Sequence, residues 1–257
     1  MLDPVAQPTR TEPDAPAPAP PAPAPNAGRR AVAAIEVVLA SGLPTQLAIG
    51  ALVLAAGLSP FAADGQLSMA YVATVLAADT VVLMALIAWR LHESGEGVRP
   101  VMLGAGRWTR EAGLGLALVP LVGGGVAALM AMLRWAWPWL HNVAANPFET
   151  LARSPGNAAV LLVLVVVSGG LKEECQRAFV LHRFEQSLGG ARAGLAIYSV
   201  VFGAGHMIQG YDVGIATMLL GVAWGLVFLR RRSIVAPMVC HAGFNAAQVV
   251  TFIISGA

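Results

Sequence analysis

Residues 158–177 read AAVLLVLVVVSGGLKEECQR, an apolar run that ends in four charged side chains. The apolar part does not alternate between polar and apolar residues, so it does not predict a strand of a membrane barrel. Its length predicts a helix over about 158–181 that crosses a bilayer, because about 20 helical residues span roughly 30 Å of hydrocarbon. The charged end, Lys172-Glu173-Glu174-Cys175-Gln176-Arg177, holds the residue types that hydrocarbon normally excludes.

The composition of the whole chain points the same way. Of 257 residues, 57% are apolar and 12% are charged, and the mean hydropathy is +0.69. A soluble domain carries roughly a quarter charged residues, and two cysteines do not form the disulfide framework of a small secreted protein. We therefore predict an all-α, polytopic membrane helix bundle of about seven (six to eight) transmembrane helices.

Seven apolar runs carry this prediction. They lie at about 31–58, 68–89, 112–133, 158–181, 192–209, 213–229 and 234–255, and the first is interrupted by Pro44. Residues 1–28, which are rich in proline and alanine, are predicted to be a disordered cytoplasmic tail because such a composition cannot bury a core.

The arginines predict an orientation. They alternate between dense and sparse connections, and the dense groups contain Arg29-Arg30, then Arg90, Arg99, Arg107 and Arg110, then Arg183 and Arg192, and finally Arg230-Arg231-Arg232. Positive residues favour the cytoplasmic side, which predicts a cytoplasmic N-terminus. The preference for arginine over lysine, together with the Ala/Pro-rich tail, favours a bacterial inner (plasma) membrane.

The charged end of the 158–181 run has two readings. If the helix continues, Glu173 and Arg177 are four residues apart and can pair, while Glu174 points about 100° away and is left free for proton transfer. Alternatively, these charges mark the solvated cytoplasmic end of the span.

Two later runs also contain polar residues. His206 ends the sequence Phe202-Gly203-Ala204-Gly205-His206, and His241 and Asn245 share one helix face four residues apart. Counted at about 1.5 Å per residue from each predicted cytoplasmic end, the acids lie about 10–12 Å deep, His241 and Asn245 about 10–17 Å, and His206 about 20 Å. Helix tilt can bring these depths into one layer, which predicts a single site.

This set of residues favours hydrolysis by activated water. The chain lacks a G-x-S-x-G nucleophile motif, whereas a carboxylate and a histidine activate water, and an amide or a second histidine can stabilise an oxyanion. A divalent metal such as zinc, held by His206 and His241 with Glu173, is an open alternative, although no H-E-x-x-H motif is present.

These three motifs resemble the type II CAAX prenyl protease family, also called the CAAX-protease and bacteriocin-processing family. The family pattern is Glu-Glu…Arg, Phe-x-x-x-His and His-x-x-x-Asn on successive spans, matched here by Glu173-Glu174…Arg177, Phe202…His206 and His241…Asn245. The resemblance implies an intramembrane endopeptidase whose catalytic residues are Glu173, Glu174, Arg177, His206, His241 and Asn245. It also implies a peptide or membrane-protein substrate and divides the chain into N-terminal membrane helices (29–154) and a catalytic core (155–257).

One position departs from the family pattern. Three residues usually separate the Glu pair from the Arg, but only Cys175 and Gln176 intervene here. Alignment on Arg177 places Lys172 at the first Glu position, whereas alignment on the acids makes Glu173 the base. Glu173 belongs to the pair in both alignments and is the preferred base. The departure also keeps open a non-proteolytic scaffold or immunity-type protein of the same fold, and intramembrane Glu and His leave a proton-coupled transporter as a third reading. The sequence has no basic groove with interleaved aromatic residues, so nucleic-acid binding is not predicted.

Overall fold

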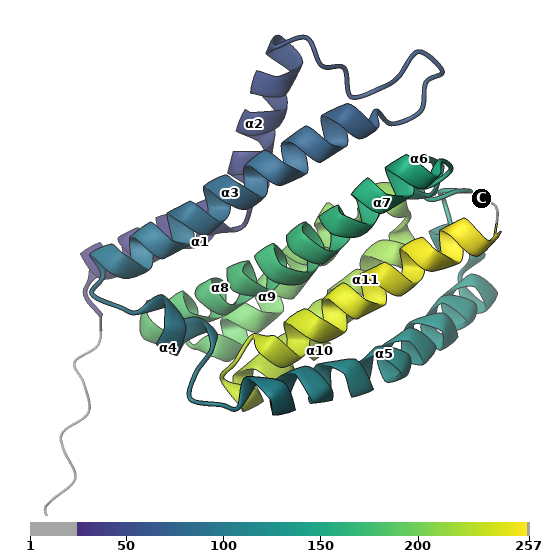
Figure 1. Ribbon diagram of the computed structural model, residues 1–257. Coiled ribbons are helices and arrows are strands. Elements are labelled where there is room, and N and C mark those ends of the chain that lie inside the picture. The colour runs from purple at the N-terminus through teal and green to yellow at the C-terminus, as the bar shows by residue number, and fades with distance from the viewer. Residues whose placement is uncertain (1–24, 256–257) are drawn as a thin grey trace, which may run out of the picture.

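The computed structural model describes residues 25–255, and every regular element in this part of the chain is a helix (Figure 1). The first five helices are α1 (Ala27–Ala40), α2 (Leu43–Ala55), α3 (Met69–Glu93), α4 (Val98–Met102) and α5 (Trp108–Ala136). They are followed by the 3-10 turn η1 (Pro138–Leu140), α6 (Pro147–Leu151), α7 (Pro155–Leu164), the π-helix η2 (Val165–Lys172) and α8 (Glu173–Ser187). The last elements are α9 (Ala191–Gly205), the turn η3 (Met207–Gln209), α10 (Tyr211–Arg231) and α11 (Val235–Ser255). The all-α prediction is confirmed.

Five of the described helices are long and apolar enough to cross a membrane, namely α3, α5, α9 with η3, α10 and α11. The pair α1–α2, bent by 46°, makes six if it counts as one span. The predicted span at 158–181 is divided among α7, η2 and α8, which have 10, 8 and 15 residues. Large apolar side chains such as Leu52, Val81 and Leu121, each 70% exposed, cover the outside of the bundle. A soluble protein buries such residues, so the chain is an integral membrane protein.

The first predicted run is interrupted near Pro44, as the sequence predicts. It breaks at Ser41-Gly42, where Gly42 adopts a left-handed φ of 83°, and Pro44 sits in the first turn of α2, where its missing N–H costs nothing. The predicted tail over 1–28 lies largely outside the described residues. Its last two residues, Ala27 and Gly28, already belong to α1, whose first turn is capped by the Asn26 side chain.

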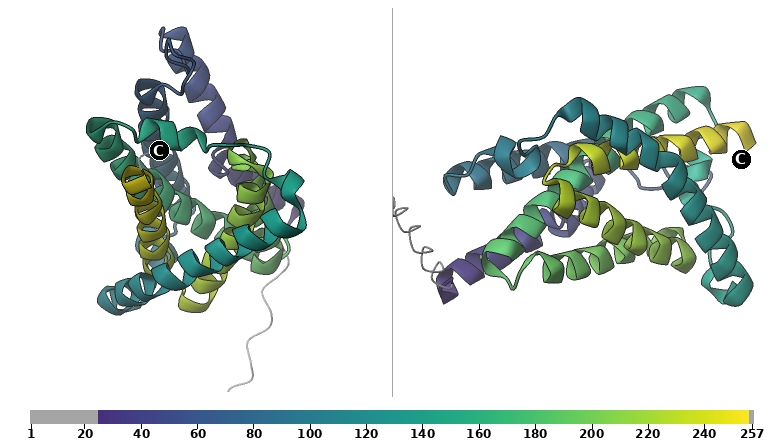
Figure 2. Two further views of the ribbon diagram at one scale, coloured as in Figure 1. Left: turned by 90° about the vertical axis from the view of Figure 1, so that its right-hand side faces the viewer. Right: turned by 90° about the horizontal axis from the view of Figure 1, so that it is seen from below.

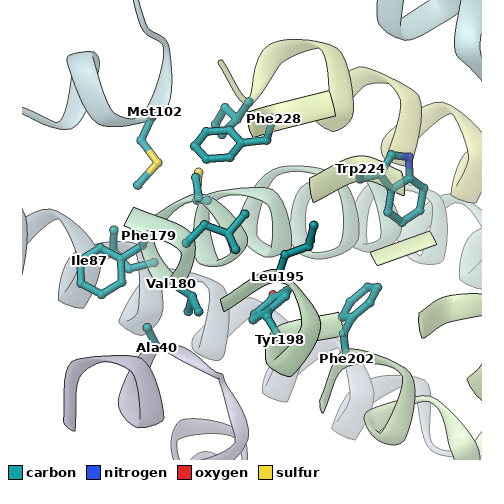
Figure 3. Packing of buried hydrophobic residues seen from close by; sticks show 14 of the residues in the cluster. Ala40, Ile87, Met102, Phe179, Val180, Leu195, Tyr198, Phe202, Trp224 and Phe228 are labelled. Carbon is teal, nitrogen blue, oxygen red and sulfur yellow. The ribbon is translucent and has the colours of Figure 1, made fainter. Parts of the chain in front are cut away.

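The core of the bundle is built around α8. Ala178, Phe179, Val180 and Leu181 are all almost completely buried, and they pack with residues of α1, α3, α4, α9, α10 and α11 (Figure 3). Both cysteines, Cys175 and Cys240, are free and buried in this cluster. The two views of Figure 2 show that the helices splay apart toward their ends. Helix α8, whose first turn carries Glu173 and Glu174, is therefore the central element of the fold.

Candidate active site

The candidate site begins where η2 passes into α8. Gly169 and Gly170 lie in the last turns of η2, directly against α11. A Cβ on Gly169 would lie 2.5 Å from the Asn245 amide nitrogen, and one on Gly170 would lie 2.7 Å from the Cβ of Ala242. Only glycine fits at position 170, and a side chain at position 169 would displace the Asn245 amide. The pair therefore allows α11 to approach the first turn of α8, which carries the acids.

Glu174, Arg177 and His241 form the buried centre of the site. Oε1 of Glu174 lies 2.9 Å from Nδ1 of His241 and also forms an ion pair with Nη1 of Arg177. Glu174 is 1% exposed, Arg177 0% and His241 3%. The spacing had predicted that Arg177 pairs with Glu173 and leaves Glu174 free. This prediction is wrong, because the ion pair joins residues three apart.

Glu173 is the freer carboxylate. Its Oε2 lies 3.8 Å from Nε2 of His241, and its side chain is 19% exposed. The His241 ring therefore stands between two acids, with Nδ1 toward Glu174 and Nε2 toward Glu173. Since a carboxylate accepts the Nδ1 proton, the neutral ring keeps a lone pair on the Nε2 that faces Glu173.

Aromatic rings fix this arrangement. Trp224 of α10 stacks on His241 with ring centroids 3.8 Å apart and an interplanar angle of 19°. The guanidinium of Arg177 lies 5.2–5.6 Å from the ring centroids of Tyr198, Phe202 and Trp224. Apart from the ion pair with Glu174, the Arg177 guanidinium has no polar partner among the described residues, so its charge is balanced by Glu174 and by these ring faces.

His206 lies at the end of α9, in contact with the same aromatic group. Its ring is 4.8 Å from the ring of Phe202, which is 6.2 Å from His241. Nδ1 of His206 lies 2.8 Å from the carbonyl oxygen of Phe202. A carbonyl can only accept, so Nδ1 carries the proton and Nε2 is free. Among the described contacts, however, none joins His206 directly to Glu173 or Glu174.

Asn245 follows His241 by one turn of α11, as predicted. Its amide nitrogen lies 3.5 Å from the carbonyl oxygen of Val165, at the limit for a hydrogen bond. The amide therefore faces η2 beside Gly169 and has donor capacity to spare.

The residues do not fit the metal alternative. Among residues 25–255, no three His, Cys, Asp or Glu side chains are arranged to hold an ion. His241 is already engaged at Nδ1 by Glu174, and His206 contacts the rings instead of the acids. A catalytic zinc normally requires three convergent protein ligands, so the set of Glu173, His206 and His241 is not assembled.

Lys172 lies outside this centre. It is 1% exposed, and its Nζ lies 2.8 Å from Oδ2 of Asp79 in α3, which is fully buried. The Asp79 carboxylate also accepts hydrogen bonds from Thr45 at 2.6 Å and Gln46 at 3.2 Å, both in α2. Lys172 therefore faces the N-terminal helices. In the sequence Asp79 is a lone acid in an apolar run, and nothing in the spacing indicates that Lys172, the only lysine of the chain, is its partner.

Residues 134–146 hold the turn that follows His206, a contact that the sequence did not predict. Asp212, which is fully buried, lies 2.9 Å from Nδ1 of His141 and 3.4 Å from Nε of Arg134. Asn146 donates to Gln209 at 2.9 Å, and Asn142 accepts from the Tyr211 backbone at 2.8 Å. Residues 134–146 thus fix the start of α10 and the turn after His206.

The fold and the site define a polytopic helical membrane protein with a buried acid–imidazole cluster. In comparison with known proteins, residues 155–247 match the type II CAAX prenyl endopeptidase Rce1-like family. The resemblance inferred from the three motifs is confirmed over this segment, which contains all six predicted site residues. No curated protein and no solved structure matches the chain.

Proposed function

We propose that the protein is an intramembrane endopeptidase that hydrolyses a peptide bond with water activated between Glu173 and His241. The observation that carries the proposal is the placement of Nε2 of His241 3.8 Å from Oε2 of the partly exposed Glu173. The family match over residues 155–247 supports a protease with a peptide substrate.

Glu173 is the general base in this mechanism. It takes a proton from a water molecule whose oxygen adds to the carbonyl carbon of the scissile bond. His241 orients this water through Nε2. The amide of Asn245 donates a hydrogen bond to the oxyanion that forms, where such a donor is most effective in a site with little water. His206 can add a second hydrogen bond only in its doubly protonated form, because Nδ1 already donates to the Phe202 carbonyl. Glu173 then returns the proton to the leaving amine as the C–N bond breaks, which yields a carboxylic acid and an amine, and proton transfer between the products gives the carboxylate and the ammonium.

Glu174 and Arg177 are positioning residues in this scheme. Glu174 holds Nδ1 of His241 and thereby sets both the orientation and the tautomer of the ring. Arg177 holds Glu174 in turn. Because Oε1 of Glu174 is engaged by both His241 and Arg177, this carboxylate is a poor base, which supports the choice of Glu173.

The Asp79 partner also answers the argument for a non-proteolytic protein. That reading rested on Lys172 standing at a Glu position of the family pattern. The Lys172–Asp79 ion pair gives the lysine a structural role that leaves Glu173 and Glu174 as the family's acid pair. We further propose that the protein resides in a bacterial inner membrane with its N-terminus in the cytoplasm, because the arginine-rich connections lie at one end.

The test is cleavage of a quenched-fluorescent peptide library by detergent-purified protein, with wild type beside His241→Ala and Glu173→Gln. Cleavage by wild type only, unchanged by a chelator, is the expected result. Cleavage that persists in Glu173→Gln would show that another group is the base. Cleavage abolished by a chelator and restored by zinc would contradict the metal-free mechanism.

A further inference from the structure

The arginines at one end of the bundle fall into two groups. Some are neutralised by carboxylates: Arg231 pairs with Glu111, and Arg232 pairs with Glu185. Their neighbours are not neutralised, because within the described residues no carboxylate pairs with the exposed arginines Arg99, Arg107, Arg110 and Arg230. We call these four residues the arginine surface.

The four side chains belong to one place in the fold. The connection between α4 and α5 is pressed onto the turn between α10 and α11, since the Ile234 amide donates to the Met102 carbonyl at 2.8 Å. At Gly104, with φ of 57°, a Cβ would lie 2.3 Å from the Arg232 carbonyl oxygen. Figure 1 shows α4, the start of α5 and the α10–α11 turn together at one end of the bundle.

The apolar residues beside these arginines are those of a membrane interface. Trp108, 49% exposed, lies next to Arg107, and the Arg99 guanidinium is 5.7 Å from its ring centroid. Val98 is 45% exposed in the adjoining short helix α4. Tryptophan and arginine together are typical of the headgroup layer of a bilayer.

We propose that the arginine surface binds the headgroup phosphates of anionic phospholipids such as phosphatidylglycerol. A guanidinium offers paired N–H donors to phosphate oxygens. These four arginines have no carboxylate partner and therefore have a net positive charge to neutralise. The exposed Trp108 can insert between the upper parts of the acyl chains, just below the headgroups. The surface therefore fits a lipid, which supplies a phosphate and an apolar tail side by side, better than a soluble phosphate.

The test is native mass spectrometry of the full chain in a non-ionic detergent, titrated with phosphatidylglycerol, phosphatidylcholine or inorganic phosphate. Wild type should bind phosphatidylglycerol in preference to phosphatidylcholine, and millimolar inorganic phosphate should not displace it. Each neutralised arginine should weaken binding about fivefold, so the triple variant Arg99→Gln/Arg107→Gln/Arg110→Gln should lose about a hundredfold.

Arg110→Gln and Arg153→Gln form a matched pair, because both remove one exposed arginine that no described carboxylate pairs with, from different parts of the chain. Only the first should weaken phosphatidylglycerol binding. A triple Arg→Lys variant should keep most of it. Equal affinity of wild type and Arg110→Gln, or displacement of the lipid by inorganic phosphate, would overturn the proposal, and the single variants decide this even if the triple variant does not fold.

Discussion

The two faces of α8 and of the turn before it carry buried charged residues that pair with different parts of the chain. The face toward α10 and α11 carries Glu174 and Arg177, joined to His241. The face toward α1–α3 carries Lys172, paired with Asp79, and Gln176, whose amide donates to the Ala40 carbonyl at 2.9 Å. The first face belongs wholly to the segment that matches the family, whereas the second depends on partners outside it. A buried charge therefore does not by itself mark a catalytic residue.

Replacing Glu173 and Glu174 one at a time tests whether the side of α8 that faces α11 is the catalytic one. Glu173→Gln should lower kcat by about 10²–10⁴-fold, the usual contribution of a general base, with little change in thermal stability because Glu173 is partly exposed and makes no close ion pair. Glu174→Gln should lower kcat as well, but unlike Glu173→Gln it should unfold at a clearly lower temperature than wild type. Removing one member of a buried ion pair costs about 3–5 kcal/mol, and Arg177 would be left with no carboxylate.

Peptide cleavage and thermal unfolding in detergent, measured on both variants, check this difference. Identical unfolding temperatures for the two variants would contradict the assignment of Glu174 as the paired acid. Full activity in Glu173→Gln, with loss only in Glu174→Gln, would exchange their roles.

The Lys172–Asp79 pair of the second face should contribute to the stability of the fold and not to catalysis. Lys172→Met alone leaves Asp79 buried without its cation, and Asp79→Leu alone leaves the lysine, so each should destabilise the protein by about 3–5 kcal/mol. The double variant should recover most of that loss, because two apolar residues of similar size can replace a buried pair. Denaturant or thermal unfolding of the three variants measures the recovery, and losses that simply add would mean that the two residues do not interact.

Lys172→Glu tests the alternative alignment directly. It restores an acid at the position that alignment on Arg177 gives to the family's first Glu. Because Lys172 faces Asp79 at 2.8 Å, the new acid should repel that carboxylate, destabilise the fold and give no gain in cleavage. A Lys172→Glu variant that is more active than wild type would instead show that the wild-type chain lacks the catalytic base at this position.

The sequence predicted the location of the site because membrane spans exclude polar residues, so Glu173, His206, His241 and Asn245 stood out. It did not predict which acid Arg177 binds. Spacings of three and four residues both bring side chains together on a helix, and the choice is made by His241, which α11 places against Glu174. That approach depends on Gly169 and Gly170 in a π-helix, which an apolar run does not reveal.

The partners of Lys172 and Asp212 could not be predicted from the sequence for a related reason. Asp79 lies 93 residues from Lys172, and His141 lies 71 residues from Asp212. Hydropathy places each residue in or near a span but does not say which helices are neighbours. The interruption of the first run was predicted from Pro44, but the left-handed turn at Gly42 was not, because a proline suits the start of a helix as well as its interruption.

The smallest expected effect concerns Glu96, beyond the end of α3. Burial raises the pKa of Glu96, but hydrogen bonds from Arg183, His182 and Gln186 outweigh it and hold the pKa below the ordinary value of 4.5. A carboxyl group with a lowered pKa in the folded state contributes stability above its unfolded pKa and loses it as the pH falls through the folded value. The unfolding temperature should therefore drop modestly below about pH 4.5, and Glu96→Gln should flatten that part of the profile. Glu93→Gln, an exposed acid with no described ion pair, is the matched control. Equal slopes for Glu96→Gln and wild type would mean that Glu96 does not connect α8 to the end of α3 in the folded protein.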